Sequence, residues 1–368
     1  MTRSSWGWRL AAVAAGVALA LGLVACGDDD SASSTSGGGG SAASLDVAYV
    51  TVQQHPYGIA VDSFIKAVND TGTLTLSPQP VYPQSEVQLL ADVRSGVVPM
   101  ATMSTAIWDT AGITAFQALQ APFLITNYPL ALAVEGGDIG AAMIKSATAE
   151  AGDLVVLAIH EGGLRKPLGK PVLASLADFK GKTIRAPQSQ VLAEGLNAIG
   201  AVAEPTPLPE VYQALQNGAV DGVEANLPLI YTQKWYEQAK NLTANINFWP
   251  FPTALAINKA VYDGLTAEQQ TALTDAAAGI TQASIDIFTT PGSTVAQDLF
   301  NCGVKYVIAT DADVAALTAA GQSAIANLDS ESQDFVTQIQ AEKDALGPPP
   351  PPPPLPTSKT GECVPPAG

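Results

Sequence analysis

Apolar residues recur at strand and helix spacings along most of the chain. Residues 45–52 (LDVAYVTV) alternate apolar and polar positions, as a half-buried strand does. The next apolar residues, Ile59, Phe64, Ile65 and Val68, return at helical spacing, so we expect a helix that buries these four side chains. Further expected strands cover residues 74–81, 97–104, 154–160, 242–248, 253–257 and 304–308, and further helices cover 85–95, 128–146, 189–199, 209–217, 266–288 and 313–346. This alternation predicts an α/β fold with mostly parallel sheets.

Two helix starts carry the residues of a capping box. Ser85 is followed three residues later by Gln88, and Thr266 by Gln269. The second of these helices is long, and the Pro291-Gly292 pair just beyond it predicts a kink or break.

The first 25 residues read as a signal peptide, because Arg3 and Arg9 precede an apolar run that is too short to span a membrane. The run ends in LVAC, which resembles the lipobox of bacterial lipoproteins, and Cys26 is therefore the expected lipid attachment site. The alternative is an ordinary secretory signal in which this cysteine is incidental.

Low-complexity segments flank the part that can fold. Residues 26–44 are rich in Ser, Gly and Ala and predict a flexible tether. Residues 347–368 include seven consecutive prolines, Pro348 to Pro354, which favour a stiff polyproline II rod of roughly 20 Å. The globular part is therefore expected to cover residues 45–346, enough for two lobes.

Cys302 and Cys363 remain after Cys26 is assigned to lipid. In an exported protein an even pair favours a disulfide, which would hold the proline-rich tail against the second lobe as a brace. Two independent free thiols, with the tail as a plain linker, are the alternative.

Composition limits the function classes. The net charge is −17, which argues against binding to nucleic acid and against a polybasic membrane surface. GxSxG, HExxH and CxxC motifs are absent from the sequence, and its two histidines offer little for acid–base catalysis. Asp221 and Glu224 are a carboxylate pair for a hydrolase in principle, but three residues apart in a strand they face opposite sides. We therefore expect no enzyme, no metal site and no cofactor.

The most informative residues are Arg165 and Arg185, which lie 20 positions apart beside expected strands. Strand ends in open α/β sheets are common ligand sites. The guanidinium fork matches a carboxylate with two hydrogen bonds, which Lys cannot do. Capture of a small organic acid is one interpretation, and a plain ion pair with a nearby Asp or Glu is the other.

The surrounding motifs favour the first interpretation. The chain carries GLR at 163–165, KGKTIRAP at 180–187, EVYQALQNGAVDG at 210–222 and KWYE at 234–237. Their order and spacing resemble the substrate-binding proteins of tripartite ATP-independent periplasmic (TRAP) transporters, in the family of dicarboxylate and sialic-acid binders. The resemblance extends more weakly over residues 45–346.

The resemblance implies a two-lobed periplasmic-binding-protein fold of type II, with the ligand cleft between the lobes and a long helix spanning both. Residues 45–162 and 251–290 would form the first lobe, and residues 163–250 and 291–346 the second.

The resemblance also assigns roles. Arg185 would hold the ligand carboxylate and Arg165 would support it. Many members have Asn directly after the VDGxE segment, whereas this chain has Ala225 there and Asn226 next, which leaves the ligand's identity open.

Further side chains are expected at the cleft because they follow strands or cross between the lobes. They are His55, Tyr57, Thr105 and Trp108 in the first lobe, and Phe248 and Trp249 at the crossing. The alternative for His55 is that it is an ordinary polar loop residue, and the alternative for Trp108 is that it packs in the core. His160, inside an apolar strand, is interpreted as structural.

The sequence thus predicts an extracytoplasmic solute-binding protein, lipid-anchored to the outer face of the cell membrane, that delivers a carboxylate to a TRAP permease. A ligand-presenting accessory of a membrane sensor kinase is the alternative, and an exported hydrolase is a remote one.

Overall fold

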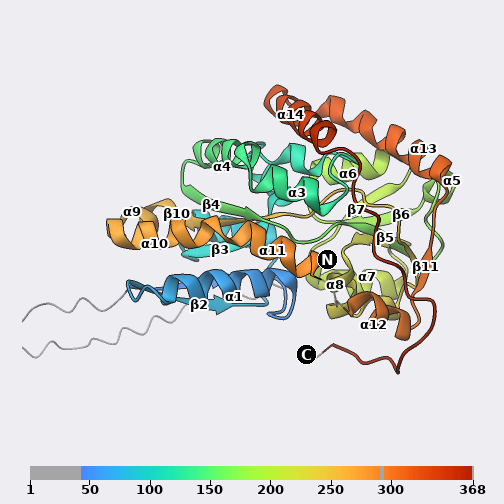
Figure 1. The fold of residues 1–368 in the computed structure, drawn as a ribbon, viewed down its shortest axis with the longest axis horizontal. Helices are drawn as coiled ribbons and strands as arrows, with labels where there is room; N and C mark the ends of the chain where they lie inside the picture. Colours follow the sequence, from blue (N-terminus) through green and yellow to red (C-terminus); the bar gives the residue numbers. More distant parts are fainter. Residues whose placement is uncertain (1–42, 291–293, 367–368) are drawn as a thin grey trace, which may run out of the picture. The chain divides into compact units, whose positions relative to one another are not determined.

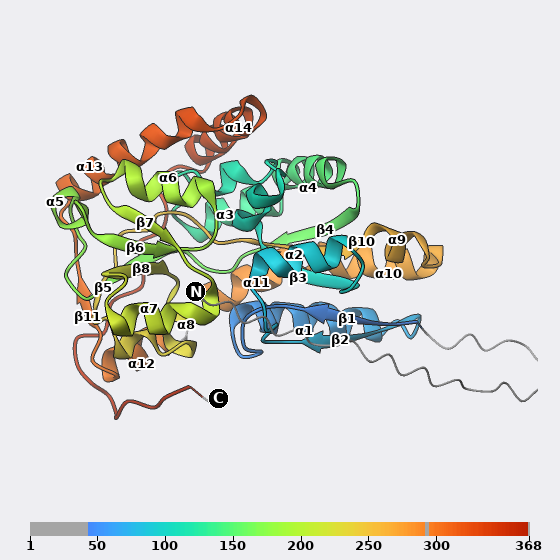
Figure 2. The same ribbon diagram turned by 180° about the vertical axis from the view of Figure 1, so that it is seen from behind.

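The computed structural model describes residues 43–290 and 294–366. The expected signal peptide, the lipidation site Cys26, most of the tether and the Pro291-Gly292 break lie outside these ranges. The expected strands and helices are arranged around two separate sheets (Figures 1 and 2). Within the described ranges, no helix is both long and apolar enough to cross a bilayer.

The first sheet has the strand order β2-β1-β3-β10-β4. Its strands are β1 (Ala43–Ala48), β2 (Leu74–Gln79), β3 (Met100–Ser104), β4 (Leu154–His160) and β10 (Thr253–Asn258). β1 pairs in parallel with β2 and β3, and β10 runs antiparallel between β3 and β4. A strand from late in the chain therefore completes the sheet that the N-terminal half begins.

The helices of this half are α1 (Pro56–Asn69), α2 (Glu86–Arg94), α3 (Tyr128–Glu135), α4 (Asp138–Ala151), α9 (Lys259–Asp263), α10 (Ala267–Ala278) and α11 (Ile280–Thr289). In α1, Phe64, Ile65 and Val68 are buried as expected. The prediction for Ile59 is wrong, since it is 42% exposed. Val61 occupies the buried face instead, because it lies three and four residues before Phe64 and Ile65.

The second sheet has the order β11-β9-β5-β8-β6-β7. Its strands are β5 (Lys166–Gly169), β6 (Thr183–Ala186), β7 (Val202–Pro205), β8 (Gly222–Ala225), β9 (Asn241–Thr243) and β11 (Lys305–Val307). Its helices are α5 (Leu176–Phe179), α6 (Gln190–Ala198), α7 (Val211–Asn217), α8 (Leu227–Thr232), α12 (Val295–Asn301) and α13 (Asp311–Gln322). β6 is parallel to both β7 and β8, so the strand that carries Arg185 is an interior strand of this sheet.

Glycine divides two helices that the sequence predicted as continuous. The helix expected over 128–146 is α3 followed by α4, with Gly136 and Gly137 between them. The long helix begins at Thr266 with the expected capping box, but Gly279 splits it into α10 and α11. Glycine disfavours a helix interior, which explains why the breaks fall there.

Two of the segments that cross between the sheets are hydrogen-bonded to each other. They lie between β4 and β5 and between β9 and β10, and a later crossing leads from β10 to β11 by way of α11. The Arg165 amide donates to the Trp249 carbonyl, and the Phe248 amide donates to the Arg165 carbonyl, each at 2.9 Å. The Ser284 hydroxyl of α11 accepts from the Glu161 amide at 2.8 Å. The junction between the sheets is therefore built from both crossings and α11.

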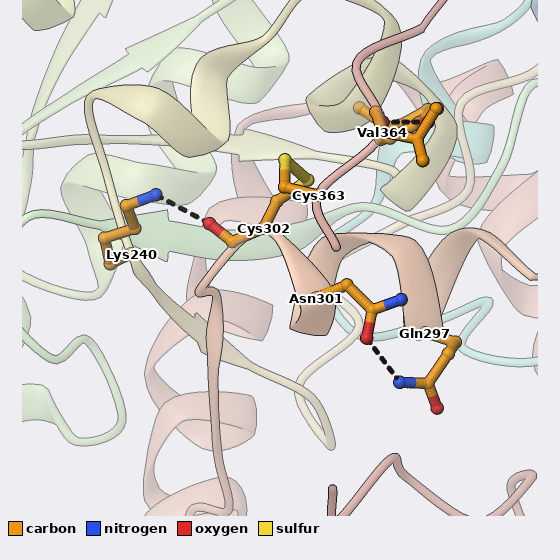
Figure 3. Close-up of a disulfide and its surroundings, with 7 residues drawn as sticks. Lys240, Gln297, Asn301, Cys302, Cys363 and Val364 are labelled. Carbon is orange, nitrogen blue, oxygen red and sulfur yellow. Dashed lines mark hydrogen bonds between the residues drawn. A yellow bond between two sulfur atoms is a disulfide. The ribbon is translucent and has the colours of Figure 1, made fainter. Parts of the chain in front are cut away.

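The C-terminal segment contacts both halves. Helix α14 (Ser330–Leu346), which the sequence assigned to the second lobe, contacts α3, α4 and the 3-10 helix Gln117–Gln120 of the first. The tail then descends past β6 to α12 (Figure 1). There it is joined by a disulfide between Cys302 and Cys363 (Figure 3). The Tyr231 hydroxyl donates to the Val364 carbonyl at 2.6 Å, so the tail also touches α8.

Candidate functional site

A small cavity lies where the two halves of the fold meet. Its volume is ≈ 20 Å³, enough for about one water molecule. The first half contributes Val50, Thr51, His55, Tyr57 and Glu86, the crossings contribute Arg165 and Phe251, and the second half contributes Arg185, Pro187, Leu208, Asn226 and Leu229. The structure therefore brings both arginines, His55, Tyr57 and Asn226 to one place, as the sequence predicted.

Arg185 lies in β6 and is only 3% exposed. Its Nε and Nη2 donate to the Thr206 carbonyl at 3.0 and 2.7 Å, which fixes the guanidinium plane. Within the described residues, its Nη1 makes no hydrogen bond and no carboxylate lies within ion-pair distance. Burial lowers the pKa of Arg185 to about 9, with Glu224 and Glu86 opposing that shift. The guanidinium is thus still positively charged at neutral pH.

Arg165 is also buried, but its charge is matched. Its Nε donates to Glu224 Oε2 at 2.6 Å, and its Nη2 donates to Oε1 of the same carboxylate at 3.0 Å. The guanidinium lies 4.2 Å from the centre of the Phe251 ring. Its third nitrogen, Nη1, is buried without a hydrogen-bond partner in the described structure. Arg165 therefore has one nitrogen, Nη1, that is free to donate, and its charge is compensated by Glu224.

Asn226 caps α8 and holds the Gly162 loop in place. Its Oδ1 accepts from the Leu229 amide at 2.7 Å, and its Nδ2 donates to the Gly162 carbonyl at 2.6 Å. Gly163 has a φ of +108°, and an added Cβ would lie 2.8 Å from the Asn226 Cβ. Only glycine fits here, because the backbone conformation and the close approach both exclude a side chain.

His55 caps α1 at the cavity wall. Its Nδ1 accepts from the Tyr57 amide at 3.2 Å, so in the neutral ring the proton lies on Nε2. Burial lowers the pKa of His55 to about 3, which keeps the ring neutral. Neither Nε2 nor the nearby Thr51 Oγ1 has a hydrogen-bond partner in the described structure. His55 therefore presents a neutral N–H donor.

The sequence analysis missed Glu86, Thr51 and Phe251. Glu86 opens α2, and its Oε1 accepts from the Ser104 amide at 2.9 Å. Burial raises the pKa of this carboxyl, while Arg185 and Arg165 oppose the rise. An acidic residue in the first turn of a helix is usually explained by its favourable interaction with the helix dipole. Nothing in the sequence therefore marks Glu86 as a cavity residue.

Four predicted site residues are not brought to the cavity. Trp108 is fully buried in the core of the first half, where its ring centre is 5.3 Å from that of Phe116. Thr105 bonds to the Pro252 carbonyl at 3.0 Å. Phe248 packs against Phe123 and Phe179, and Trp249 donates to Glu224 Oε2 at 3.2 Å. These four side chains pack or form hydrogen bonds elsewhere and do not line the cavity.

The two carboxylates considered for hydrolysis are both occupied. Glu224 is held by Arg165, and Asp221 Oδ2 accepts from the Thr183 amide at 2.9 Å. They therefore form no acid–base pair at the cavity. His160, interpreted as structural, bonds to Thr102 and Thr253 at 2.7 Å each.

A second buried pair of acidic side chains lies at the junction. Glu135 ends α3 and Glu161 follows β4, and both are at most 2% exposed. Each carboxyl group feels the charge of the other, which favours a proton on one of them. Burial and the charge of Glu161 raise the pKa of Glu135 well above its usual value. Burial also raises the pKa of Glu161, although the Gly163 amide at 2.5 Å stabilises its charged form.

Comparison with known proteins matches residues 47–331 to the family model "bacterial extracellular solute-binding protein, family 7". The C4-dicarboxylate-binding periplasmic protein DctP of Rhodobacter capsulatus is 32% identical over 202 residues, which are 54% of this chain and 60% of DctP. The 2,3-diketo-L-gulonate-binding periplasmic protein YiaO of Escherichia coli is 29% identical over 64% of this chain and 72% of its own. The chain thus spans less than two thirds of DctP.

A solved structure of similar fold is a TRAP periplasmic solute-binding protein of Xanthobacter autotrophicus with bound β-D-galacturonate. It has a TM-score of 0.75 and 27% identity, and the match covers 81% of this chain and 99% of that one. The family match covers well over half of the chain and agrees with both the fold and the motifs. The chain therefore belongs to family 7 of the bacterial extracellular solute-binding proteins, the substrate-binding proteins of TRAP transporters.

Proposed function

We propose that this chain captures a small organic acid in the cavity and that Arg185 binds the ligand's carboxylate. The observation that carries the proposal is the unbalanced charge of Arg185. Its guanidinium is buried at the cavity, is held in plane by the Thr206 carbonyl, and has no carboxylate within ion-pair distance in the described structure. A buried cation without a counter-ion is costly, and a bound carboxylate removes that cost.

Two other donors and one positioning residue support the same carboxylate in this proposal. Arg165 Nη1 and His55 Nε2 are both buried without partners. Asn226 keeps the Gly162 loop against the cavity. An ionised carboxylate offers about four lone pairs, which these groups and Arg185 can fill.

Capture requires the two halves to separate and then to close around the acid, because the cavity takes residues from both halves and its volume of ≈ 20 Å³ holds only about one water molecule. The closed protein then delivers the acid to a TRAP-type membrane permease. The ligands for which several similar proteins are named, C4-dicarboxylate, diketogulonate and galacturonate, support a carboxylate as cargo.

The chain binds its ligand without transforming it. Support comes from the cavity, whose charged groups are Arg165, Arg185 and Glu86, with His55 held neutral. In this proposal Cys26 is lipidated and anchors the protein at the outer face of the membrane, on the strength of the LVAC sequence. Mass spectrometry of the mature N-terminus would test this, since a free thiol at Cys26 contradicts the anchor.

A thermal-shift screen of the lipid-free protein against mono- and dicarboxylates, oxo acids and sugar acids tests the function. A micromolar binder at millimolar concentration should contribute about 4 kcal/mol, which is a large upward shift in Tm. Mass spectrometry of the recovered acid should show no turnover. A panel in which no acid raises the Tm contradicts carboxylate capture, and a chemically changed acid contradicts the binding-only role.

A further inference from the structure

Glu86 and Arg185 line the same cavity without pairing with each other. Ion pairs in the described structure join Lys66 to Asp70, Arg94 to Asp153, Arg165 to Glu224 and Lys259 to Asp263, so neither cavity residue is among them. One oxygen of Glu86 is used by the Ser104 amide. The second oxygen makes no hydrogen bond within the described ranges. Opposite charges therefore face one small space from its two sides, Glu86 from α2 and Arg185 from β6.

The charged groups that line the cavity indicate which groups the ligand carries at its two ends. Arg165 is neutralised by Glu224 directly behind it, which leaves one positive group, Arg185, and one negative group, Glu86. The free donors, Arg165 Nη1 and His55 Nε2, complement a carboxylate together with Arg185. Glu86 is an acceptor when ionised, so it complements a different part of the ligand, one that donates.

We infer that the ligand is a monocarboxylate with a second group that donates a hydrogen bond to Glu86, either a hydroxyl or a protonated nitrogen. This inference rests on the proposed function and narrows it. A dicarboxylate of the same length would place its second negative charge against Glu86, and a like charge in a buried site costs affinity.

Matched acids that differ in one group test the inference. The probes are 4-hydroxybutyrate, 4-aminobutyrate and succinate, which share a four-carbon skeleton, and galactonate and galactarate, which share a six-carbon one. Calorimetry should show that the hydroxyl or ammonium member of a set binds about 10-fold to 100-fold more tightly than the dicarboxylate, as a charge-assisted hydrogen bond implies.

Glu86→Gln is the diagnostic variant. The amide oxygen can still accept from the Ser104 amide, but the charge is gone and the amide group can donate to a carboxylate. We expect the preference over the dicarboxylate to shrink about 10-fold or more. Glu268→Gln is the control, since Glu268 also lies in a first helical turn, that of α10, but is exposed. It should leave every affinity unchanged.

The outcomes separate this inference from the proposed function. If no acid binds, either in these sets or in the wider screen, carboxylate capture by this cavity fails and the inference fails with it. If acids bind through Arg185 but the dicarboxylate is the tighter ligand in both sets, only the inference is overturned. An unchanged preference in folded Glu86→Gln would also overturn it, because another group would then read the second end of the ligand.

Discussion

Arg165 and Glu224 form a buried ion pair with two parallel hydrogen bonds, at 2.6 and 3.0 Å, and both side chains are at most 1% exposed. The Trp249 indole adds a third donor to the same carboxylate. The pair links the first crossing segment to β8 of the second sheet. Because both charges are removed from water, each depends on the other.

Replacement of one partner should therefore be costly. We expect Arg165→Met to lower the free energy of unfolding by about 3–5 kcal/mol, because Glu224 would remain as a buried, uncompensated charge. Urea denaturation measures this. The double variant Arg165→Met with Glu224→Gln should recover part of the loss. A single variant as stable as the parent would show that the pair is not buried.

The carboxyl pair Glu135 and Glu161 makes stability depend on pH. The folded protein raises the pKa of Glu135, so it holds a proton that the unfolded chain releases above about pH 4.3. The contribution of Glu135 to the free energy of unfolding therefore falls as the pH rises from about 4.3 toward the pKa of Glu135 in the folded protein. Glu135→Gln mimics the protonated acid and should remove this loss.

Denaturation of Glu135→Gln and the parent between pH 4.5 and pH 8 checks the sign. The advantage of the variant should grow with pH, with a slope of at most about 1.4 kcal/mol per pH unit, and vanish at the acid end. Glu268→Gln on the surface serves as the control and should show no such trend. An advantage that shrinks as the pH rises would contradict a raised pKa of Glu135 in the folded protein.

Gly163 should be intolerant of any side chain. Gly163→Ala combines a φ of +108° with a contact of 2.8 Å to Asn226, and we expect both lower stability and weaker ligand binding. Gly152→Ala is the matched control, since its φ is +69° but nothing lies within 4 Å. It should cost roughly 1 kcal/mol and leave binding unchanged. Equal effects of the two on binding would refute a role for this contact.

The disulfide should stabilise without contributing to the cavity. Cys302 and Cys363 are separated by 61 residues, and closing a loop of that length is worth about 4 kcal/mol in the chain-entropy account. Cys302→Ser and Cys363→Ser should lower the Tm equally and leave ligand affinity nearly intact. A normal melting curve in both would mean that the bond does not restrain the unfolded chain.

Local patterns predicted most elements of this fold. The capping box at Thr266 and the apolar run of β4 depend on neighbours in sequence, and both are found as expected. The splits at Gly136 and Gly279 were missed because a single glycine is tolerated in a helix unless packing on either side bends it.

The site was partly predictable for a similar reason. Arg165, Arg185 and Asn226 lie in motifs with fixed spacing, and the structure brings all three to the cavity. Glu86 lies 99 residues before Arg185 in sequence, and only the folded structure brings the two side chains to one cavity. Trp108 was predicted at the site but lies in the core. The sequence was equally consistent with both positions, because a large aromatic ring can pack in the core or contact a ligand.

The most direct test of the account is calorimetric binding of the tightest acid from the screen to the parent, Arg185→Met and Arg94→Met. Arg94 forms its ion pair with Asp153 away from the cavity and controls for loss of an arginine. The account predicts that Arg185→Met stays folded and loses about 2–5 kcal/mol of binding, roughly 30-fold to 5,000-fold in Kd, while Arg94→Met binds like the parent. Unchanged affinity in folded Arg185→Met would contradict carboxylate capture by this residue.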